Sequence, residues 1–301
     1  MCENPRSASF VIVPQTLFRS EEAAAAAPVP GEVLTRWTMS PLLRASAAVH
    51  VGAAVAFAAR PDLWPAWLGV LAADHALLTF AGLWPRCDWL GPNLTRLPAA
   101  AAARGEVALT LDDGPDPEVT PQVLDLLDAA GAKATFFCIA ERARAHPELL
   151  REMLRRGHSV QNHSRHHRHT FSLLGPEGFR REISQAQAIF TALTGQTPAF
   201  FRAPAGLRNP FLEPVLHRLG LRLASWTRRA YDTREGDPAR VLATLTAGLA
   251  AGDILLLHDA NAARGADGRP VILAVLPELL AAFGRAGLHA VTLPEAMKEG
   301  A

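Results

Sequence analysis

The sequence predicts an α/β fold, a parallel barrel of repeated β/α units. From Glu106 onward, short apolar runs alternate with segments that have helical periodicity. Several helical segments begin with proline in their first turn, a common start signal. Acidic, histidine and arginine residues follow the apolar runs, as active-site residues follow the strands of a barrel.

Seven apolar runs are expected to form strands, at residues 106–111, 134–139, 158–161, 199–202, 221–226, 253–257 and 289–293. Helices are expected between them, for example at 121–130, 147–156, 176–193 and 238–251. No internal repeat is apparent, so the barrel forms one domain, expected over residues 105–301.

The N-terminal part predicts a different organisation. Residues 1–40 lack periodicity and a signal peptide and are expected to be disordered, with Met39 as an alternative start. Apolar stretches at 46–59 and 64–84 predict a helical membrane hairpin over residues 41–86, followed by a linker at 87–104. Trp64, Trp67 and Trp84 near the stretch ends are typical of a membrane interface.

A soluble helical cap is the alternative interpretation of this hairpin, because Asp74-His75 would be costly in lipid. If the hairpin spans a membrane, the arginines favour cytoplasmic ends. Those flanking the hairpin are Arg36, Arg44, Arg86, Arg96 and Arg104, whereas the connection carries only Arg60, offset by Asp62. The catalytic domain is then expected in the cytoplasm.

Composition excludes some classes of partner. The chain has 30 basic and 29 acidic residues among 301, so no nucleic-acid binding is expected. Cys2, Cys87 and Cys138 show no paired spacing, which argues against a disulfide scaffold and fits a reducing compartment.

The most informative motif is Asp112-Asp113-Gly114-Pro115, directly after the apolar run 107–111. Adjacent side chains leave a strand in different directions, so one carboxylate can bind a metal while the other transfers protons. The Gly-Pro turn would hold both at the strand's C-terminal end.

A histidine-rich run follows at residues 158–169. His163 and His167 are four residues apart and would share one face of a helical turn. Two imidazoles and one carboxylate form an open three-ligand metal site, which leaves a position for water.

Three further side chains follow later apolar runs. Arg202 could hold a carboxylate ionised and oriented through hydrogen bonds. His258 is placed for general acid chemistry near neutral pH, and Asp232 could orient its imidazole.

These segments, in this order, resemble the motifs of polysaccharide deacetylases with a NodB homology domain, carbohydrate esterase family 4. The motifs are Leu111–Pro115, His163–His167, Arg202–Gly206, Trp226–Asp232 and Leu256–His258. The resemblance covers residues 105–296 and implies a distorted (β/α)7-type barrel. Ala205 and Thr233 stand where the family usually has Tyr and Trp.

The resemblance implies roles for individual residues. Asp113, His163 and His167 would hold a divalent metal, most often Zn²⁺, with Co²⁺, Ni²⁺ and Mn²⁺ as alternatives. Asp112 would be the general base, fixed by Arg202, and His258 the general acid, steered by Asp232. The backbone N–H of Ala205 would help to stabilise the tetrahedral oxyanion.

The implied activity is removal of an N-acetyl group from an amino sugar in a polysaccharide or a lipid-linked saccharide. A deformylase or amidase acting on a lipid-linked amino sugar, and an inactive carbohydrate-binding or scaffold protein, are alternatives. The two missing aromatics suggest a substrate unlike a long glucosamine polymer, and cytoplasmic placement would favour a lipid-linked precursor. Loop arginines could contact its phosphate, namely Arg208, Arg228, Arg229, Arg234 and Arg264.

Overall fold

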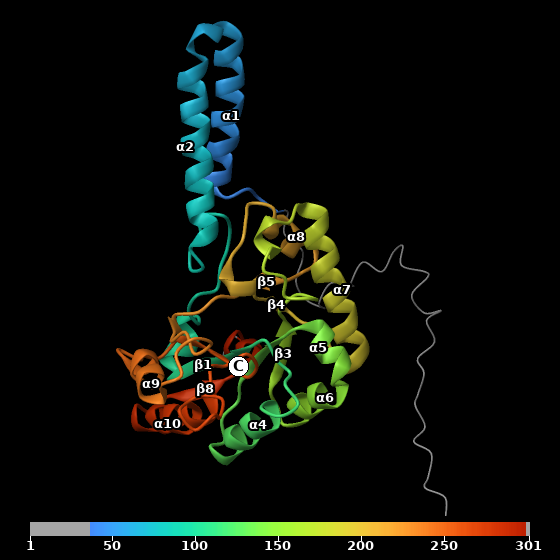
Figure 1. Ribbon diagram of the computed structural model, residues 1–301, viewed down its shortest axis with the longest axis vertical. Coiled ribbons are helices and arrows are strands. Elements are labelled where there is room, and N and C mark those ends of the chain that lie inside the picture. Colours follow the sequence, from blue (N-terminus) through green and yellow to red (C-terminus); the bar gives the residue numbers. More distant parts are fainter. Residues whose placement is uncertain (1–36, 299–301) are drawn as a thin grey trace, which may run out of the picture. The chain divides into compact units, whose positions relative to one another are not determined.

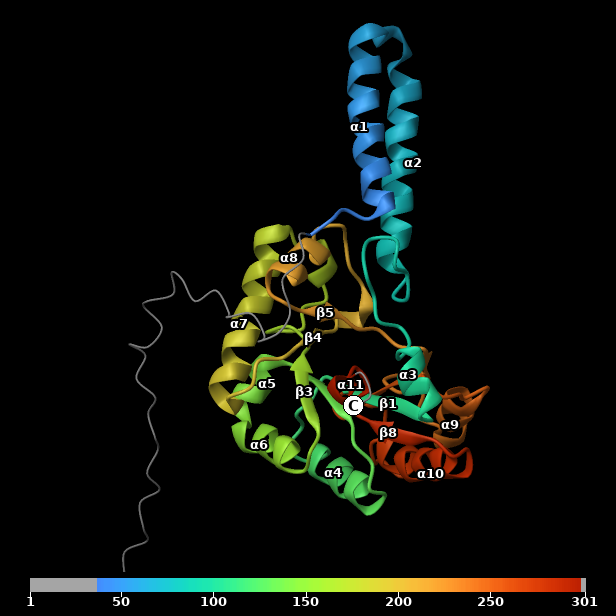
Figure 2. The ribbon, with the colours of Figure 1, turned by 180° about the vertical axis from the view of Figure 1, so that it is seen from behind.

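The computed structural model describes residues 37–298. Eight parallel strands form one curled sheet in the order β5-β4-β3-β2-β1-β7-β6, with β8 paired to β1. Helices α4, α5, α6 and α7 lie along the outer side of this sheet (Figure 1), and Figure 2 shows the same arrangement from behind. The sheet and its helices confirm the predicted barrel-type α/β fold.

The strands are β1 (Glu106–Asp112), β2 (Thr135–Cys138), β3 (Ser159–Asn162), β4 (Phe200–Phe201), β5 (Arg222–Leu223), β6 (Arg228–Arg229), β7 (Ile254–His258) and β8 (His289–Val291). The barrel helices are α3 (Ala99–Ala103), α4 (Thr120–Ala129), α5 (Ala140–Ala145), α6 (Pro147–Arg155), α7 (Pro176–Thr194), α8 (Leu212–Arg218), α9 (Pro238–Thr246), α10 (Ile272–Arg285) and α11 (Leu293–Ala296). Short 3₁₀ turns are η3 (Phe171–Leu173) and η4 (Pro204–Gly206).

The core explains why the strand runs are apolar throughout. Every residue of β7 is buried, and β1 is buried from Val107 to Asp112. The main apolar cluster lies between the sheet and the outer helices and includes Leu109, Leu124 and Leu276. A second cluster, which includes Phe137, Trp226 and Leu256, packs the other face of the sheet. Parallel strands covered on both faces need no polar alternation.

Strand register places the functional side chains at one level. Asp112 pairs with His258 and Phe137, and Asn162 pairs with Cys138 and Phe201. Asp112 and His258 end their strands, whereas His163 and Arg202 directly follow theirs. All four therefore meet at the C-terminal edge of the sheet.

One segment outside the predicted strands takes part in sheet pairing. Leu94 bridges Ala224 beside β5, and Arg96 bridges Asp253 before β7. Residues 94–96 lie within the segment assigned to a linker, and here they connect the β5 edge of the sheet to the start of β7. Strand β6 was also absent from the predicted elements, because its two residues are arginines with no apolar run.

The N-terminal helical pair consists of α1 (Pro41–Ala59), the 3₁₀ turn η2 (Pro61–Leu63) and α2 (Trp64–Leu83). Both helical stretches, Pro41–Ala59 and Pro61–Leu83, are long and apolar enough to cross a membrane. Only 11% of each apolar window is buried, so the helices do not form the core of a soluble domain. The segment predicted to be disordered falls almost wholly on residues 1–36, outside the described residues.

Candidate active site

Asp112 is fixed by a buried arginine. Arg202 Nη1 donates to Asp112 Oδ1 at 2.6 Å, and Arg202 is only 1% exposed. The guanidinium also donates to the Thr110 hydroxyl and to the carbonyls of Ala224 and Ser225. These bonds fix the guanidinium, which in turn holds the Asp112 carboxylate in one orientation.

Asp113, His163 and His167 converge on one point. Asp113 Oδ1 lies 3.4 Å from His163 Nε2 and 3.2 Å from His167 Nε2. This oxygen is buried and has no hydrogen-bond partner within the described residues. Ligands that share a tetrahedral zinc at about 2.0–2.2 Å lie roughly 3.4 Å apart. The spacing of the three atoms therefore fits a divalent metal.

The protonation states of these residues also suit metal binding. The Nδ1–H of His163 donates to the Arg202 carbonyl at 2.8 Å, which leaves the lone pair on Nε2. Burial, reinforced by His163, lowers the pKa of His167 to about 4, so its imidazole is neutral at pH 7. Burial alone raises the pKa of Asp113, but His163 and His167 outweigh it and keep the pKa below its ordinary value.

Two residues that the sequence analysis did not single out support Asp113. Asn261 Nδ2 donates to Asp113 Oδ2 at 2.9 Å, and Arg142 Nη1 donates to the Asp113 carbonyl at 2.9 Å. Arg142 also donates to the Asn261 side chain. Together they leave Oδ1 of Asp113 as the oxygen that faces the histidines.

His258 and Asp232 form a buried pair. The imidazole Nδ1 lies 2.9 Å from Asp232 Oδ1, and the His258 backbone N–H donates to Oδ2 at 2.8 Å. Burial alone lowers the pKa of His258, but the hydrogen bond and charge of Asp232 raise it above its ordinary value. The pair thus favours a protonated imidazole, the form that can act as an acid.

The backbone at the site is unusual. In residues 37–298, the non-glycine residues with positive φ are Asp113, Ser164, His167, Ala205, Tyr231 and Asn261. All six lie in segments that follow strands of the sheet. Asp113, His167 and Ala205 are predicted site residues, Ser164 and Tyr231 adjoin one in the chain, and Asn261 donates to Asp113. Such conformations cluster at functional sites because surrounding contacts compensate for the strain.

The expected helical turn between His163 and His167 is wrong, since residues 163–168 form an irregular loop. The two imidazoles still meet, with ring centroids 4.8 Å apart, because Ser164 and His167 adopt left-handed backbone. The Ser164 hydroxyl accepts from the His167 backbone N–H and stabilises this bend.

A cavity of about 690 Å³ opens over these side chains. Every predicted metal, base and acid residue lines it, as do Ala205, Thr233 and Arg229, whereas Arg202 and Asp232 stand behind the wall. Of the five loop arginines, Arg229 alone lines this cavity. Arg208 and Arg228 are engaged elsewhere, with the Cys87 carbonyl and with Asp253, so the expectation for these two is wrong.

The segment that leaves α2 packs behind part of this wall. Gly206 lines the cavity and has a φ of 75°, and a Cβ there would meet the Trp226 ring at 2.5 Å and Pro85 at 2.7 Å. The Ser225 hydroxyl donates to the Pro85 carbonyl, and Arg86 donates to the Thr227 carbonyl. The end of the helical hairpin is therefore packed directly beside the cavity.

The fold and the cavity together define a barrel hydrolase. A family model described as polysaccharide deacetylase matches residues 99–224, and the curated relatives below span most of their length. The chain belongs to the polysaccharide deacetylase family, carbohydrate esterase family 4, and acts as a hydrolase on the N-acetyl amide bonds of amino sugars.

Two relatives illustrate the similarity. A peptidoglycan-N-acetylglucosamine deacetylase of Bacillus cereus is 32% identical over 194 residues, which cover 64% of this chain and 88% of the relative. A chitooligosaccharide deacetylase of Sinorhizobium fredii is 34% identical over 209 residues, covering 67% and 96%.

Solved structures agree on the fold. A family 4 carbohydrate esterase from Streptomyces lividans, in complex with acetate, is 30% identical with a TM-score of 0.56, covering 62% of this chain and 91% of the other. A family 4 pseudoenzyme from Bacillus anthracis has 19% identity, a TM-score of 0.61 and 69% coverage of both chains. At that identity the second likeness concerns the fold alone.

Proposed function

We propose that this chain is a metal-dependent deacetylase that removes the acetyl group from an N-acetylated glucosamine unit. The observation that carries the proposal is the convergence of Asp113, His163 and His167 beside a separate, arginine-held Asp112. A catalytically dead relative would be expected to lack a ligand or the base, and this chain keeps both. The names of the peptidoglycan and chitooligosaccharide deacetylases support the choice of sugar.

The roles divide among the chain's own residues. Asp113, His163 and His167 would hold the metal, which when bound polarises the acetyl carbonyl and lowers the pKa of water. Asp112 takes the proton of the attacking water, and Arg202 keeps that carboxylate oriented. The backbone N–H of Ala205 stabilises the developing oxyanion, and His258 protonates the departing amine.

A substrate panel tests this function. The purified chain should release acetate from N-acetylglucosamine oligomers or from a lipid-linked N-acetylglucosamine, and release should stop after exhaustive chelation. Matched N-formyl sugars test the deformylase alternative. Hydrolysis of formyl substrates alone would favour that alternative, and no hydrolysis by a metal-loaded chain would contradict the proposal.

The pH profile should report the pair of His258 and Asp232. Because Asp232 raises the pKa of His258, the acid form persists to a higher pH than an ordinary histidine allows. Activity should therefore fall as pH rises through that raised pKa. In Asp232→Asn this fall in activity should occur at lower pH, which a profile of kcat against pH measures. If the fall stays at the same pH, His258 is not the general acid.

A lipid-linked saccharide is the second candidate substrate, favoured by the exit of α2. Phe80, Trp84 and Trp89 form an aromatic cluster there, with ring centroids 5.8 to 6.3 Å apart, and all three are exposed. Exposed aromatics at the end of an apolar helix are typical of a membrane interface. Pro85 lies next in the chain and is close to Gly206, which lines the cavity. A membrane at the aromatic cluster would therefore lie near the cavity.

Arg229 adds a cationic group for such a substrate. Its guanidinium stacks on the rings of Trp226 and Tyr231, at 5.1 and 4.8 Å from their centroids. Arg229 lines the cavity, and its buried Nε has no hydrogen-bond partner among the described residues. A phosphate beside the sugar could accept from this group.

The membrane anchor and the cytoplasmic placement of the catalytic domain are testable together. An alkaline phosphatase fused to Ala301 should be inactive, whereas a fluorescent protein that matures only in the cytoplasm should be bright. An active phosphatase would place the domain outside and favour an extracellular polysaccharide. Recovery of the chain in the soluble fraction would contradict the proposal that the hairpin is a membrane anchor.

A further inference from the structure

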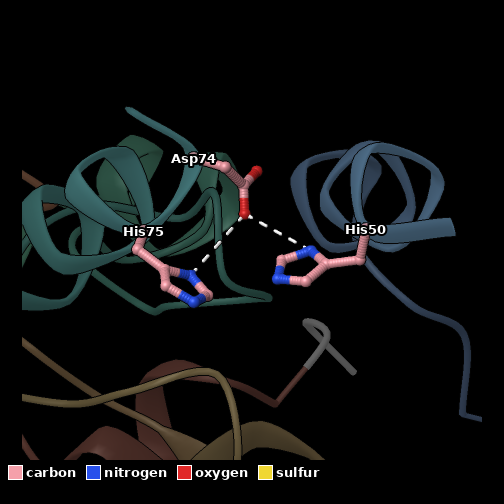
Figure 3. Close-up of side chains that lie close together, drawn as sticks. All are labelled: His50, Asp74 and His75. Carbon is pink, nitrogen blue, oxygen red and sulfur yellow. Dashed lines mark ion pairs between the residues drawn. The ribbon is translucent and has the colours of Figure 1, made fainter. Parts of the chain in front are cut away.

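The helical hairpin carries a second cluster of metal-ligating side chains. His50 lies on α1, and Asp74 and His75 lie on α2 (Figure 3). Each offers one ligand atom, and the three atoms lie within 4.8 Å of one another. The donor set repeats that of Asp113, His163 and His167. We propose that this hairpin cluster binds a divalent metal ion, of the transition metals that imidazole and carboxylate prefer.

The geometry is close to a metal site. Asp74 Oδ2 lies 3.7 Å from His50 Nδ1 and 3.9 Å from His75 Nδ1, and the two imidazole centroids are 5.1 Å apart. Ligands on one tetrahedral zinc lie roughly 3.4 Å apart. Because the three atoms lie within 4.8 Å of one another, the cluster needs to tighten by about 1.4 Å at most. The side chains of His50 and His75 are 42% and 65% exposed, which leaves them room to rotate inward.

The hydrogen bonds around the cluster prepare its ligand atoms. The Ser46 hydroxyl donates to Asp74 Oδ2 at 2.7 Å and orients the carboxylate. His50 Nδ1 lies 2.8 Å from the Ser46 carbonyl, the distance of an N–H donor to that oxygen. Binding of the ion would move this proton to Nε2, so that the Nδ1 lone pair, 3.7 Å from Asp74 Oδ2, becomes the ligand of His50.

The surroundings explain why a cation would be favoured here. Asp74 is only 9% exposed and sits near the middle of an apolar helix, where an uncompensated carboxylate is costly. One serine hydroxyl compensates only in part, whereas a divalent cation offsets the charge directly. Because its ligands come from both α1 and α2, the ion would also clamp the two helices together.

Metal content of the full chain tests this proposal. The chain is purified in detergent with a tag that contains no histidine, stripped with a chelator, reloaded with zinc and dialysed. The wild type should retain about two zinc ions, and His50→Ala/His75→Ala should retain about one. His163→Ala should also retain about one, and the combined triple variant none. Asp62→Asn, which removes an exposed carboxylate of the same hairpin, should retain both.

The His163→Ala background separates this proposal from the catalytic site. Cobalt added to that variant should give the visible absorption of a tetrahedral site, and Asp74→Asn in the same background should abolish it. An isosteric amide keeps an acceptor for Ser46, and circular dichroism verifies the helices. A His163→Ala variant that holds no zinc, or a His50→Ala/His75→Ala variant with the metal content of the wild type, would overturn the hairpin site. Either result would mean that the cluster is only an interhelical hydrogen-bond network.

Discussion

His163→Ala should abolish both the metal of the catalytic site and the deacetylase activity. His163 Nε2 is 3.4 Å from Asp113 Oδ1, and its other nitrogen is anchored to the Arg202 carbonyl, so the substitution removes an oriented ligand. Loss of the metal removes several kcal/mol of transition-state stabilisation, a fall on the order of a thousandfold or more in kcat. Acetate release and the metal content of the full chain, measured in the His50→Ala/His75→Ala background, report the two effects.

His166→Ala is the matched control for this change. His166 lies in the same loop, but its imidazole pairs with Glu182 at 2.8 Å and is outside the triad. The control should keep the catalytic metal. Equal loss of metal in both variants would show that the loop, and not the His163 ligand, had been disturbed. Full activity of His163→Ala after chelation would show that the reaction does not depend on a metal at this site.

Asp112→Asn should keep the metal and lose turnover. The amide oxygen can still accept from Arg202 Nη1, so the buried arginine retains its partner and the fold should persist. The amide cannot take a proton from water, and loss of a general base typically lowers the rate by about a hundredfold to ten-thousandfold. The expected result is wild-type metal content with kcat reduced in that range.

Asp113→Asn provides the reciprocal comparison. Asp113 Oδ1 is the oxygen that faces both histidines, so its neutral amide should weaken metal binding before it affects chemistry. Turnover of Asp113→Asn should recover at high metal concentration, whereas that of Asp112→Asn should not. If Asp112→Asn emptied the site instead, the two aspartate roles would have to be exchanged.

The sequence predicted the central strands well because the burial of each strand is visible in the residues of that strand alone. A parallel strand that is covered on both faces consists mainly of consecutive apolar residues. Ile254–His258 and Glu106–Asp112 are such strands. Strand β6 and the pairing of Leu94 with Ala224 could not be predicted this way. Both are very short, and their pairing depends on neighbours that only the folded chain supplies.

The same limit applies to the site. Asp112, His163, Arg202 and His258 were identified because each follows an apolar run and belongs to a spaced motif. Asn261 and Arg142 have no such signal, since they reach Asp113 from loops and helices far apart in the sequence. The position of Asn261, three residues after His258, was the only feature of the sequence that placed it near the site. The His163–His167 loop failed as a helical turn because positive φ at Ser164 and His167 is set by tertiary contacts.

The packing of Pro85 against Gly206 bears on how this enzyme could be engineered. The Pro85 carbonyl accepts from Ser225, whose own carbonyl accepts from Arg202, the residue that orients Asp112. The segment that follows α2 therefore belongs to the catalytic domain and not to the hairpin. A fragment trimmed to the family boundary at residue 99 would lose that brace and uncover the Trp226 ring. A soluble, crystallisable version should instead begin just before Trp84, with surface substitutions at its exposed aromatics.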